Sequence, residues 1–415
     1  MKVLEYSPDA GACASRGRMA RSLSWLRGQL SRETSSGRFI PEMDGLRFVA
    51  ISMVILFHLN GYLAVKSAFA RTPQLASDWL ANVALVGFRG VELFFVISGF
   101  ILGLPFAAHY LEDTPAVNLR KYYLRRLTRL EPPYIVALLL LFVLAVALQG
   151  ISPSTLMPHL WASLAYMHNL AYGSPSMVMG VAWSLEIEIQ FYLLVPLLTC
   201  LFAIRHRGTR RLCMAGLILS ILAIQRILFP QDSRVSLSIL GSLQYFLTGF
   251  LLADIFLTDW KQAPEQCWRW DLVALAGWPL LFFVLRSNGL THWLLPFLIL
   301  LLYYAAFRGF IFHRFFSNPW ITAVGGMCYS IYLLHYEVIS AVARWTRGFG
   351  QLAPYWLYLM LQFALVGAAI LLFCGTYFVL IEKPCMRRDW PQRLRAQSEK
   401  LFLPARRMLG SSGAD

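Results

Sequence analysis

The sequence predicts an all-α integral membrane protein with about ten transmembrane helices, and three observations predict this class. Of the 415 residues, 58% are hydrophobic, and only 14% are charged. An ordinary soluble protein is about 45–50% apolar and about 25% charged, so a soluble enzyme with one packed core is excluded. The third observation is a series of apolar runs close to the roughly 20 residues that a bilayer-spanning helix needs.

Ten such runs follow one another along the chain. The expected spans are residues 46–64, 83–104, 133–151, 181–203, 212–230, 237–258, 271–286, 292–312, 320–342 and 354–381. The run 83–104 is irregular because it contains charged residues, and 271–286 is short. The loop 152–180 is long and aromatic, and residues 156–172 suit a partial membrane helix.

Lys and Arg residues predict the orientation. If the N-terminus lies inside, 29 of the 37 Lys and Arg residues fall in inner segments. Cytoplasmic segments of membrane proteins carry such an excess. We therefore expect both termini on the cytoplasmic side. Most of the net charge of +15 is then a consequence of topology and not a sign of nucleic-acid binding.

The two ends of the chain are expected to be cytoplasmic tails, residues 1–40 and 389–415, around a membrane domain at 41–388. Residues 1–40 lack the apolar core and cleavage site of a signal peptide. Residues 16–32 suit either a basic amphipathic helix on the inner membrane face or a loose basic tail. The seven Cys residues show no C-x-x-C spacing, and we expect neither a disulfide nor a thiolate metal site.

Polar residues inside spans are costly, so each is a candidate for function. The first span contains Asp44-Gly45-Leu46-Arg47, and His58 follows eleven residues after Arg47. At 1.5 Å per residue, His58 lies roughly 16 Å further along the helix and near the same face. This arrangement suits a site reached from the cytoplasm. A snorkelling arginine and a histidine hydrogen-bonded between helices suit it equally well.

The second span contains Arg89, Glu92 and Ser98-Gly99. Arg89 and Glu92 are three residues apart, which favours a structural ion pair over catalysis. Ser98-Gly99 favours close helix packing. Ser98 lacks a G-x-S-x-G context, so it is not expected to be a hydrolase nucleophile.

Arginines precede the third span at Arg125, Arg126 and Arg129. Arginine forks suit phosphate groups. An anchor to anionic lipid explains the same charges and is favoured on charge alone.

Later spans carry further polar groups. Glu186 and Glu188 are two residues apart, so on a helix they point to different faces, and one could face a wet cavity. The ninth span contains Tyr332 and His335; a single histidine there is more often packed and hydrogen-bonded than catalytic. The chain leaves the last span at Glu382-Lys383-Pro384.

Taken in order, these segments resemble the membrane acyltransferase 3 family, the bacterial integral-membrane O-acyltransferases. Each motif alone is weak, but the ordered set from about residue 40 to 388 is specific. The matching motifs are Arg-x10-His at Arg47 and His58, FFxxSGF at Phe94–Phe100, RxxR at Arg126 and Arg129, WSLxxExxFY at Trp183–Tyr192, an SxYLLH type at Tyr329–His335, and EKP at Glu382–Pro384.

The resemblance implies transfer of an acyl group, usually acetyl, from cytoplasmic acyl-CoA to a hydroxyl group. The acceptor is usually a carbohydrate, such as a surface polysaccharide. The implied location is the bacterial inner membrane, and the implied partners are membrane lipid, acyl-CoA and the carbohydrate, without nucleic acid. No tightly bound cofactor and no metal are expected, because the thioester already supplies an activated acyl group.

The resemblance also implies roles for residues. Arg47, Arg125, Arg126 and Arg129 would bind the CoA phosphates. His58 would act as a general base, or would carry the acyl group itself, with Glu188 as a candidate to orient it. Acceptor-side candidates are Trp183, Tyr192, Tyr332 and His335; structural polar residues are Asp44, Arg89, Glu92, Ser98 and Glu382.

A proton-coupled transporter is the main alternative, because ten spans with buried Arg, Glu and His residues also suit a carrier. The sequence lacks the inverted repeats and the paired broken helices that are typical of many carriers. An accessory membrane subunit that passes on an acyl group is a further alternative.

Overall fold

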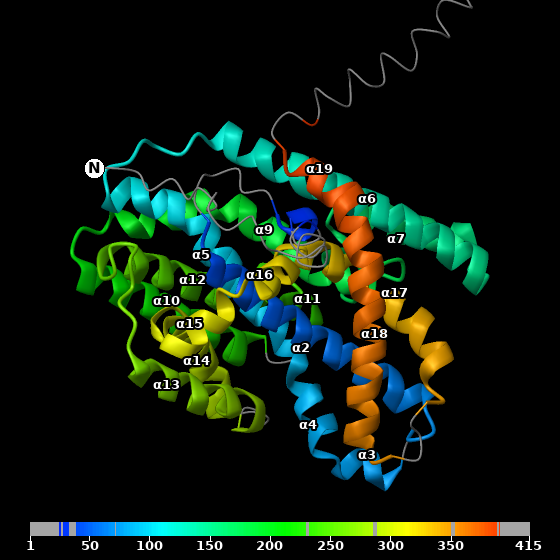
Figure 1. Ribbon diagram of the computed structural model, residues 1–415. Coiled ribbons are helices and arrows are strands. Elements are labelled where there is room, and N and C mark those ends of the chain that lie inside the picture. The colour runs from blue at the N-terminus through cyan, green and yellow to red at the C-terminus, as the bar shows by residue number, and fades with distance from the viewer. Residues whose placement is uncertain are drawn as a thin grey trace, which may run out of the picture.

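The computed structural model describes residues 25, 28–32, 39–70, 72–229, 232–284, 289–349, 353–387 and 390, and these form helices without any strand (Figure 1). Within this part of the chain, eight helical stretches are long and apolar enough to cross a membrane. They are Pro41–Lys66, Trp79–Leu111, Leu119–Gln149, Gly180–Ala203, Arg207–Leu228, Ser233–Thr258, Thr291–Arg308 and Tyr355–Cys385. The all-α membrane class is therefore confirmed.

Short 3-10 or π turns join several of the α-helices. In chain order the α-helices are α2 (Pro41–Lys66), α3 (Pro73–Ser77), α4 (Trp79–Leu85), α5 (Gly90–Leu111), α6 (Leu119–Gln149), α7 (Pro153–Leu164), α8 (His168–Tyr172), α9 (Trp183–Leu198), α10 (Arg207–Leu228), α11 (Ser233–Ser236), α12 (Ile239–Thr258), α13 (Trp268–Pro279), α14 (Leu290–Arg308), α15 (Phe310–Phe316), α16 (Pro319–Gly326), α17 (Cys328–Thr346), α18 (Tyr355–Tyr377) and α19 (Lys383–Cys385). Where one partial membrane helix was expected within 156–172, the structure has two short helices, α7 and α8.

Two of the ten expected spans take a different form. The run 271–286 contains α13, which has 12 residues and ends at Pro279, and a π turn over Leu280–Val284. The run 320–342 is divided at Met327 into α16 and α17. Gly325 and Gly326 precede this break, and glycine is common where a helix ends. The expected count of ten is therefore not confirmed.

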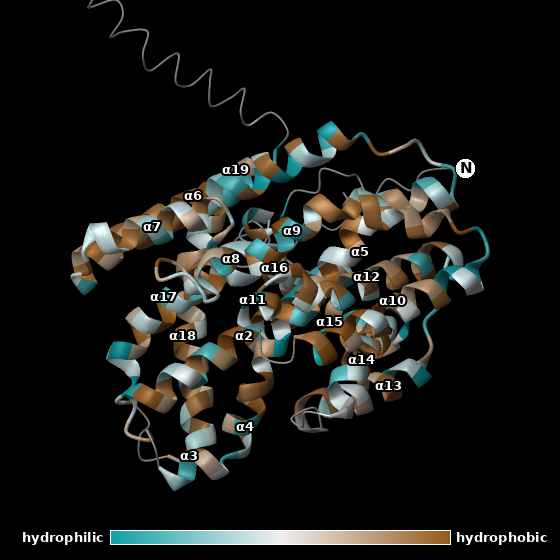
Figure 2. Cartoon of the chain, turned by 180° about the vertical axis from the view of Figure 1, so that it is seen from behind, coloured by the Kyte–Doolittle hydropathy of each residue, from teal (hydrophilic) through white to brown (hydrophobic). Residues whose placement is uncertain are grey.

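Two hydrophobic clusters make up the core, and α2 belongs to both. Its first half, including Met43 and Leu46, belongs to a cluster formed with residues of α5, α9, α10, α12 and α14. Its second half, including Leu59 and Leu63, belongs to a second cluster, formed with residues of α4, α6, α7, α17 and α18. Figure 2 shows hydrophobic residues along most helices, with hydrophilic residues in loops and at the start of α6. The central helix therefore connects the two halves of the domain.

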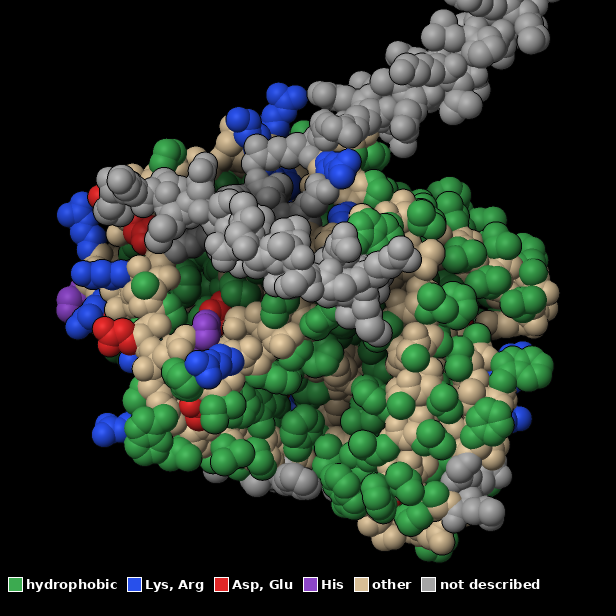
Figure 3. Space-filling model, viewed as in Figure 1, with side chains coloured by type: hydrophobic (Ala, Val, Ile, Leu, Met, Phe, Trp, Pro, Cys, Tyr) green, Lys and Arg blue, Asp and Glu red, His purple; other side chains and the backbone are tan. Residues whose placement is uncertain are grey.

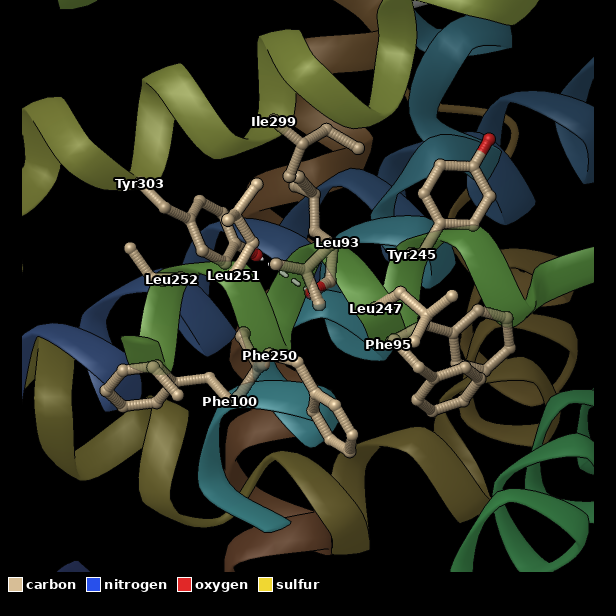
Figure 4. Close-up of a cluster of buried hydrophobic side chains, with 14 of the residues drawn as sticks. Leu93, Phe95, Phe100, Tyr245, Leu247, Phe250, Leu251, Leu252, Ile299 and Tyr303 are labelled. Atoms are coloured by element: carbon tan, nitrogen blue, oxygen red, sulfur yellow. Dashed lines mark hydrogen bonds between the residues drawn. The ribbon is translucent and has the colours of Figure 1, made fainter. Parts of the chain in front are cut away.

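Close contact between α5 and α12 depends on two glycines. A Cβ at Gly99 would lie 2.1 Å from the Phe246 carbonyl oxygen, and one at Gly249 would lie 2.3 Å from that of Val96. Small residues allow such backbone contact in membrane helices. Figure 4 shows the surrounding leucine and aromatic side chains; nearby, the Tyr303 hydroxyl donates to the Leu93 carbonyl at 2.8 Å.

Consecutive prolines interrupt the hydrogen bonding of α6 but not its course. Pro132 and Pro133 have no backbone N–H, so each removes the helical donor of the carbonyl four residues earlier in this 31-residue helix. The carbonyl left by Pro132 is that of Thr128. It accepts a hydrogen bond from the Trp390 indole Nε1 at 3.0 Å. The end of the described chain is therefore tied to the segment that carries the RxxR motif.

We predict that Gly249→Ala destabilises the protein. The atoms nearest to the added methyl group belong to the α5 backbone and cannot move aside. Overpacking of this kind costs about 1–3 kcal/mol, so the thermal midpoint of the purified protein in detergent should fall by several degrees. Gly367→Ala is the matched control, because a Cβ there meets nothing within 4 Å. Equal midpoints for the two variants would contradict the close-contact explanation.

Candidate functional site

A cavity of about 150 Å³ lies between α2, α5, α6, α9 and α17, and its lining is unusually rich in charge. Four arginines and two glutamates line it: Arg32, Arg47, Arg126, Arg129, Glu188 and Glu382. Charged groups are rarely buried unless they are paired or serve a function. This cavity is therefore the candidate site.

Asp44 holds two of the arginines. Its carboxylate is 1% exposed and forms salt bridges with Arg47 and, at 3.0 Å, with the Arg32 Nε. The neighbouring Gly45 lets α2 approach the end of α15, because a Cβ there would lie 2.1 Å from the Phe316 carbonyl oxygen. Likewise, a Cβ at Gly325 would lie 1.8 Å from the Asp44 carbonyl oxygen. The Asp44-Gly45 pair thus positions Arg47 instead of facing the cavity itself.

The RxxR arginines both reach the cavity from α6. The Arg126 guanidinium lies 5.4 Å from the Tyr122 ring centroid and 5.8 Å from that of Tyr192. The Nε atoms of Arg126 and Arg129 are buried and have no hydrogen-bond acceptor among the described residues. Arginine forks with unfilled donors suit an anion. Arg125, predicted to act with them, is not among the residues that line the cavity.

The side chains of the two glutamates of α9 point to different parts of the structure, as the helical period predicts. Glu188 faces the cavity, and its Oε1 accepts hydrogen bonds from Ser98 at 2.8 Å and Tyr192 at 2.6 Å. Glu186 is 1% exposed and accepts from the Asn169 backbone N–H at 2.8 Å, at the start of α8. Ser98 is therefore a hydrogen-bond donor within the site, while the adjacent Gly99 packs against α12.

The structure brings His58 and His335 together, with ring centroids 5.2 Å apart. The His335 Nδ1 contacts the carbonyls of Ile331 and Tyr332 at 3.0 and 2.9 Å, and carbonyls only accept. Nδ1 therefore carries the proton, and Nε2 is a buried lone pair without a partner among the described residues.

This histidine pair lies just beyond the cavity. His58 is half-buried and is not among the lining residues. Tyr332 does line the cavity, and His335 is one helical turn further along the same face of α17. A path from the arginines to the histidines would therefore pass Tyr332. Sequence reasoning placed Arg47 and His58 on one face but did not pair the two histidines.

Other predicted residues hold the helices in place. Arg89 and Glu92 form the expected ion pair at 3.0 Å, and Tyr245 donates to Glu92 at 3.0 Å. Glu382 accepts from the backbone N–H of Ser330 at 3.0 Å and from its hydroxyl at 2.5 Å. The last motif therefore fixes the start of α17 beside the arginines.

Two acceptor-side candidates differ in their surroundings. The Tyr332 hydroxyl contacts Ser184 Oγ at 2.9 Å and the Val181 carbonyl. Trp183 does not line the cavity; its carbonyl accepts from the Asn169 side chain at 2.8 Å. Tyr332 is thus placed at the cavity, and Trp183 at the base of the loop before α9.

Arg32 is the main residue of the site that sequence reasoning missed. It lies at the end of the segment 16–32 that was expected to be a membrane-surface helix or a tail. Residues 28–30 are helical, whereas 16–24 and 26–27 lie outside the described residues, as do nearly all of 389–415. Nothing in the sequence around a basic residue before the first span predicts that its side chain is buried in a site between the spans.

Comparison with known proteins decides the family. A family model described as an acyltransferase domain matches residues 40–378. The chain belongs to this family. Membership predicted from the ordered motifs is thereby confirmed. No solved structure matches the chain significantly.

Relatives of this acyltransferase-family protein include proteins named for O-acetyl transfer. A protein of Staphylococcus aureus strain COL, provisionally named an O-acetyltransferase, is 28% identical over 74% of this chain and 51% of its own length. The O-acetyltransferase OatA of S. aureus strain NCTC 8325 is 27% identical over 74% of this chain and 52% of its own length. The chain spans about half the length of these relatives.

A second histidine contact gives a pH prediction. The fully buried His168 contacts the Ser174 carbonyl through Nδ1 at 3.0 Å and His159 Nδ1 through Nε2 at 2.8 Å. Nδ1 must donate, and in the neutral ring Nε2 then accepts from His159. Burial lowers the pKa of His168. The unfolded chain therefore binds this proton more readily, and stability should fall as the pH drops through the ordinary histidine pKa of about 6.5.

The check is the thermal midpoint between pH 7.5 and 5.5. His168→Gln should be less stable than the unaltered protein at pH 7.5 but should show a shallower loss toward pH 5.5. His206→Asn is the control, because His206 is exposed and an asparagine can still cap α10. An unchanged pH slope in His168→Gln would contradict the assignment.

Proposed function

We propose that this protein is a membrane O-acetyltransferase that moves an acetyl group from cytoplasmic acetyl-CoA to a hydroxyl of a carbohydrate acceptor. The observation that carries the proposal is the cavity lined by four arginines, two of which have buried Nε donors without an acceptor among the described residues. Family membership supports acyl transfer, and the names of the relatives favour acetyl transfer to oxygen.

The proposed topology has both termini in the cytoplasm and about ten crossings of a bacterial inner membrane. On this assignment Arg47, at the start of α2, lies at the inner face. An uneven charge distribution supports this topology. In Figure 3, Lys and Arg side chains gather along the upper and left edges of the face shown, and its lower right part is largely hydrophobic. The arginine end of the cavity would then open to the cytoplasm.

Coenzyme A is a polyanion, and this chemistry fits the arginines. Its 3′-phosphate and pyrophosphate would bind at Arg47, Arg126 and Arg129, whose guanidinium groups present several N–H donors to phosphate oxygens. The acyl-bearing arm would then extend past Ser98 and Glu188 toward Tyr332. Arg125 does not line the cavity, so we assign it no phosphate contact.

The proposed chemistry occurs at the histidines. His58 would take the proton from the acceptor hydroxyl as its oxygen attacks the thioester carbonyl; the carbon–sulfur bond breaks, and the departing thiolate receives a proton from His58. The unpartnered Nε2 of His335 beside His58 supports a polar reaction centre at this depth. In the alternative order of steps, His58 first forms an acetyl-imidazole, which mass spectrometry of the acetylated protein would detect.

The first test is acetyl transfer by His58→Ala. Membranes that carry the unaltered protein should transfer labelled acetyl from acetyl-CoA to surface glycan. The transfer rate of His58→Ala should be lower by about a hundredfold or more, because general-base catalysis contributes about 10²–10⁴-fold. His206→Asn at the same protein level is the control and should keep the rate. Full activity of His58→Ala would remove this residue from the mechanism, and solute uptake without acetyl transfer would favour a carrier.

The second test is donor binding. Arg126→Gln and Arg129→Gln should each weaken CoA binding by roughly tenfold or more, because each removes charge-assisted hydrogen bonds worth about 1.5–3 kcal/mol. Calorimetric titration of the protein in detergent measures the effect. The exposed Arg120 at the start of α6 supplies the control Arg120→Gln, which should bind CoA normally. Unchanged binding in both test variants would exclude the phosphate role.

A further inference from the structure

Residues 28–32, which we name the N-terminal strap, lie against the mouth of the site although they precede the residues matched by the family model. The Lys383 Nζ donates to the carbonyls of Gly28 and Gln29 at 2.8 and 2.7 Å. Leu30 packs beside Gly375, with its Cδ2 3.5 Å from where a Cβ on that glycine would lie. The strap is therefore held by α18 and α19, from the other end of the chain.

Arg32, the last residue of the strap, places its side chain in the lining of the cavity. Arg32 packs over Gly326, lines the cavity beside Arg47 and Arg129, and is only 12% exposed. Its Nε is 3.0 Å from Asp44, but the N–H is not aligned with any acceptor among the described residues. Asp44 is already paired with Arg47, so one carboxylate serves two guanidinium groups. Glu382 also lines the cavity and interacts with Arg129 as well as with Arg32. Four arginines therefore share three carboxylates, those of Asp44, Glu188 and Glu382, and Arg32 belongs to a cluster with an excess of positive charge.

Arg32 stays charged in spite of its burial. Desolvation, followed by repulsion from Arg47, lowers its pKa to about 10. At neutral pH the guanidinium is therefore protonated, and a buried cation next to other cations is costly without a further anion. An anionic ligand at this point would remove that cost, because it brings a negative charge to several donors at once.

We propose that Arg32 is a specificity residue that binds a phosphate group of the donor nucleotide, and that the N-terminal strap delivers it to the site. This rests on the proposed function, since the donor there is acyl-CoA. The strap would favour a phosphorylated donor over an uncharged thioester, because its contribution is purely a phosphate contact. Arg32 would fill the place that sequence analysis gave to Arg125.

The experiment compares two ligands that differ only in the nucleotide part. Binding of CoA and of uncharged pantetheine is measured by titration of the full chain in detergent. Arg32→Gln should weaken CoA binding by about tenfold or more and leave pantetheine binding unchanged. Arg32→Lys, which keeps the charge but loses the fork, should recover part of the loss. Arg120→Gln is the matched control and should bind both ligands normally.

A second variant tests the strap and does not alter the guanidinium. Lys383→Met removes the hydrogen bonds to Gly28 and Gln29, so CoA binding should weaken several-fold while pantetheine binding stays normal. Equal losses for CoA and pantetheine in both variants would show a purely structural role and overturn the inference. Normal CoA binding by Arg32→Gln, with Arg126→Gln impaired, would overturn the inference alone. Failure of the unaltered protein to bind CoA would overturn the proposed function and this inference with it.

Discussion

The Asp44 carboxylate is the interaction on which the arrangement of the site depends. It is almost fully buried and is shared by Arg32 and Arg47. Breaking a buried ion pair leaves an uncompensated charge, which is far more costly than the net gain from forming the pair. The first turn of α2 and the strap must therefore come together as one unit, and the backbone contacts at Gly45 and Gly325 add the α15–α16 region. Asp44 fixes where the cationic end of the cavity lies.

Glycines decide which side chains can reach that cavity. Gly45, Gly99 and Gly325 each let backbones meet at distances that any Cβ would forbid. Helices in close contact fix the position of the neighbouring residue of each motif. Ser98 beside Gly99 lines the cavity and donates to Glu188, and Asp44 beside Gly45 pairs with Arg47. The FFxxSGF and Asp-Gly motifs thus combine a packing residue with a polar residue. Their functional and structural parts cannot be separated by position along the chain.

The helical class, the eight regular spans and all charged cavity residues except Arg32 could be predicted from the sequence, because a polar group in an apolar run is costly and therefore conspicuous. The break at Met327 was missed because hydropathy continues across it, although two glycines precede it and Gly325 packs on the Asp44 backbone. Arg32 was hidden for another reason: nothing near it in sequence indicates a return to the interior. The contact of His58 with His335 joins residues 277 positions apart, and only the fold determines it.

The lining of the cavity has a consequence for biogenesis. It draws on Arg32 near one end of the chain and Glu382 near the other, and Lys383 secures the strap only after α18 is in place. During synthesis, a partly inserted chain therefore carries the histidine of the first span but lacks the complete lining of the cavity. Contacts between distant segments form late in assembly, because the chain loses entropy in bringing the segments together before the contacts can stabilise it. On the proposed function, an unfinished chain in the membrane would therefore not bind the acyl donor.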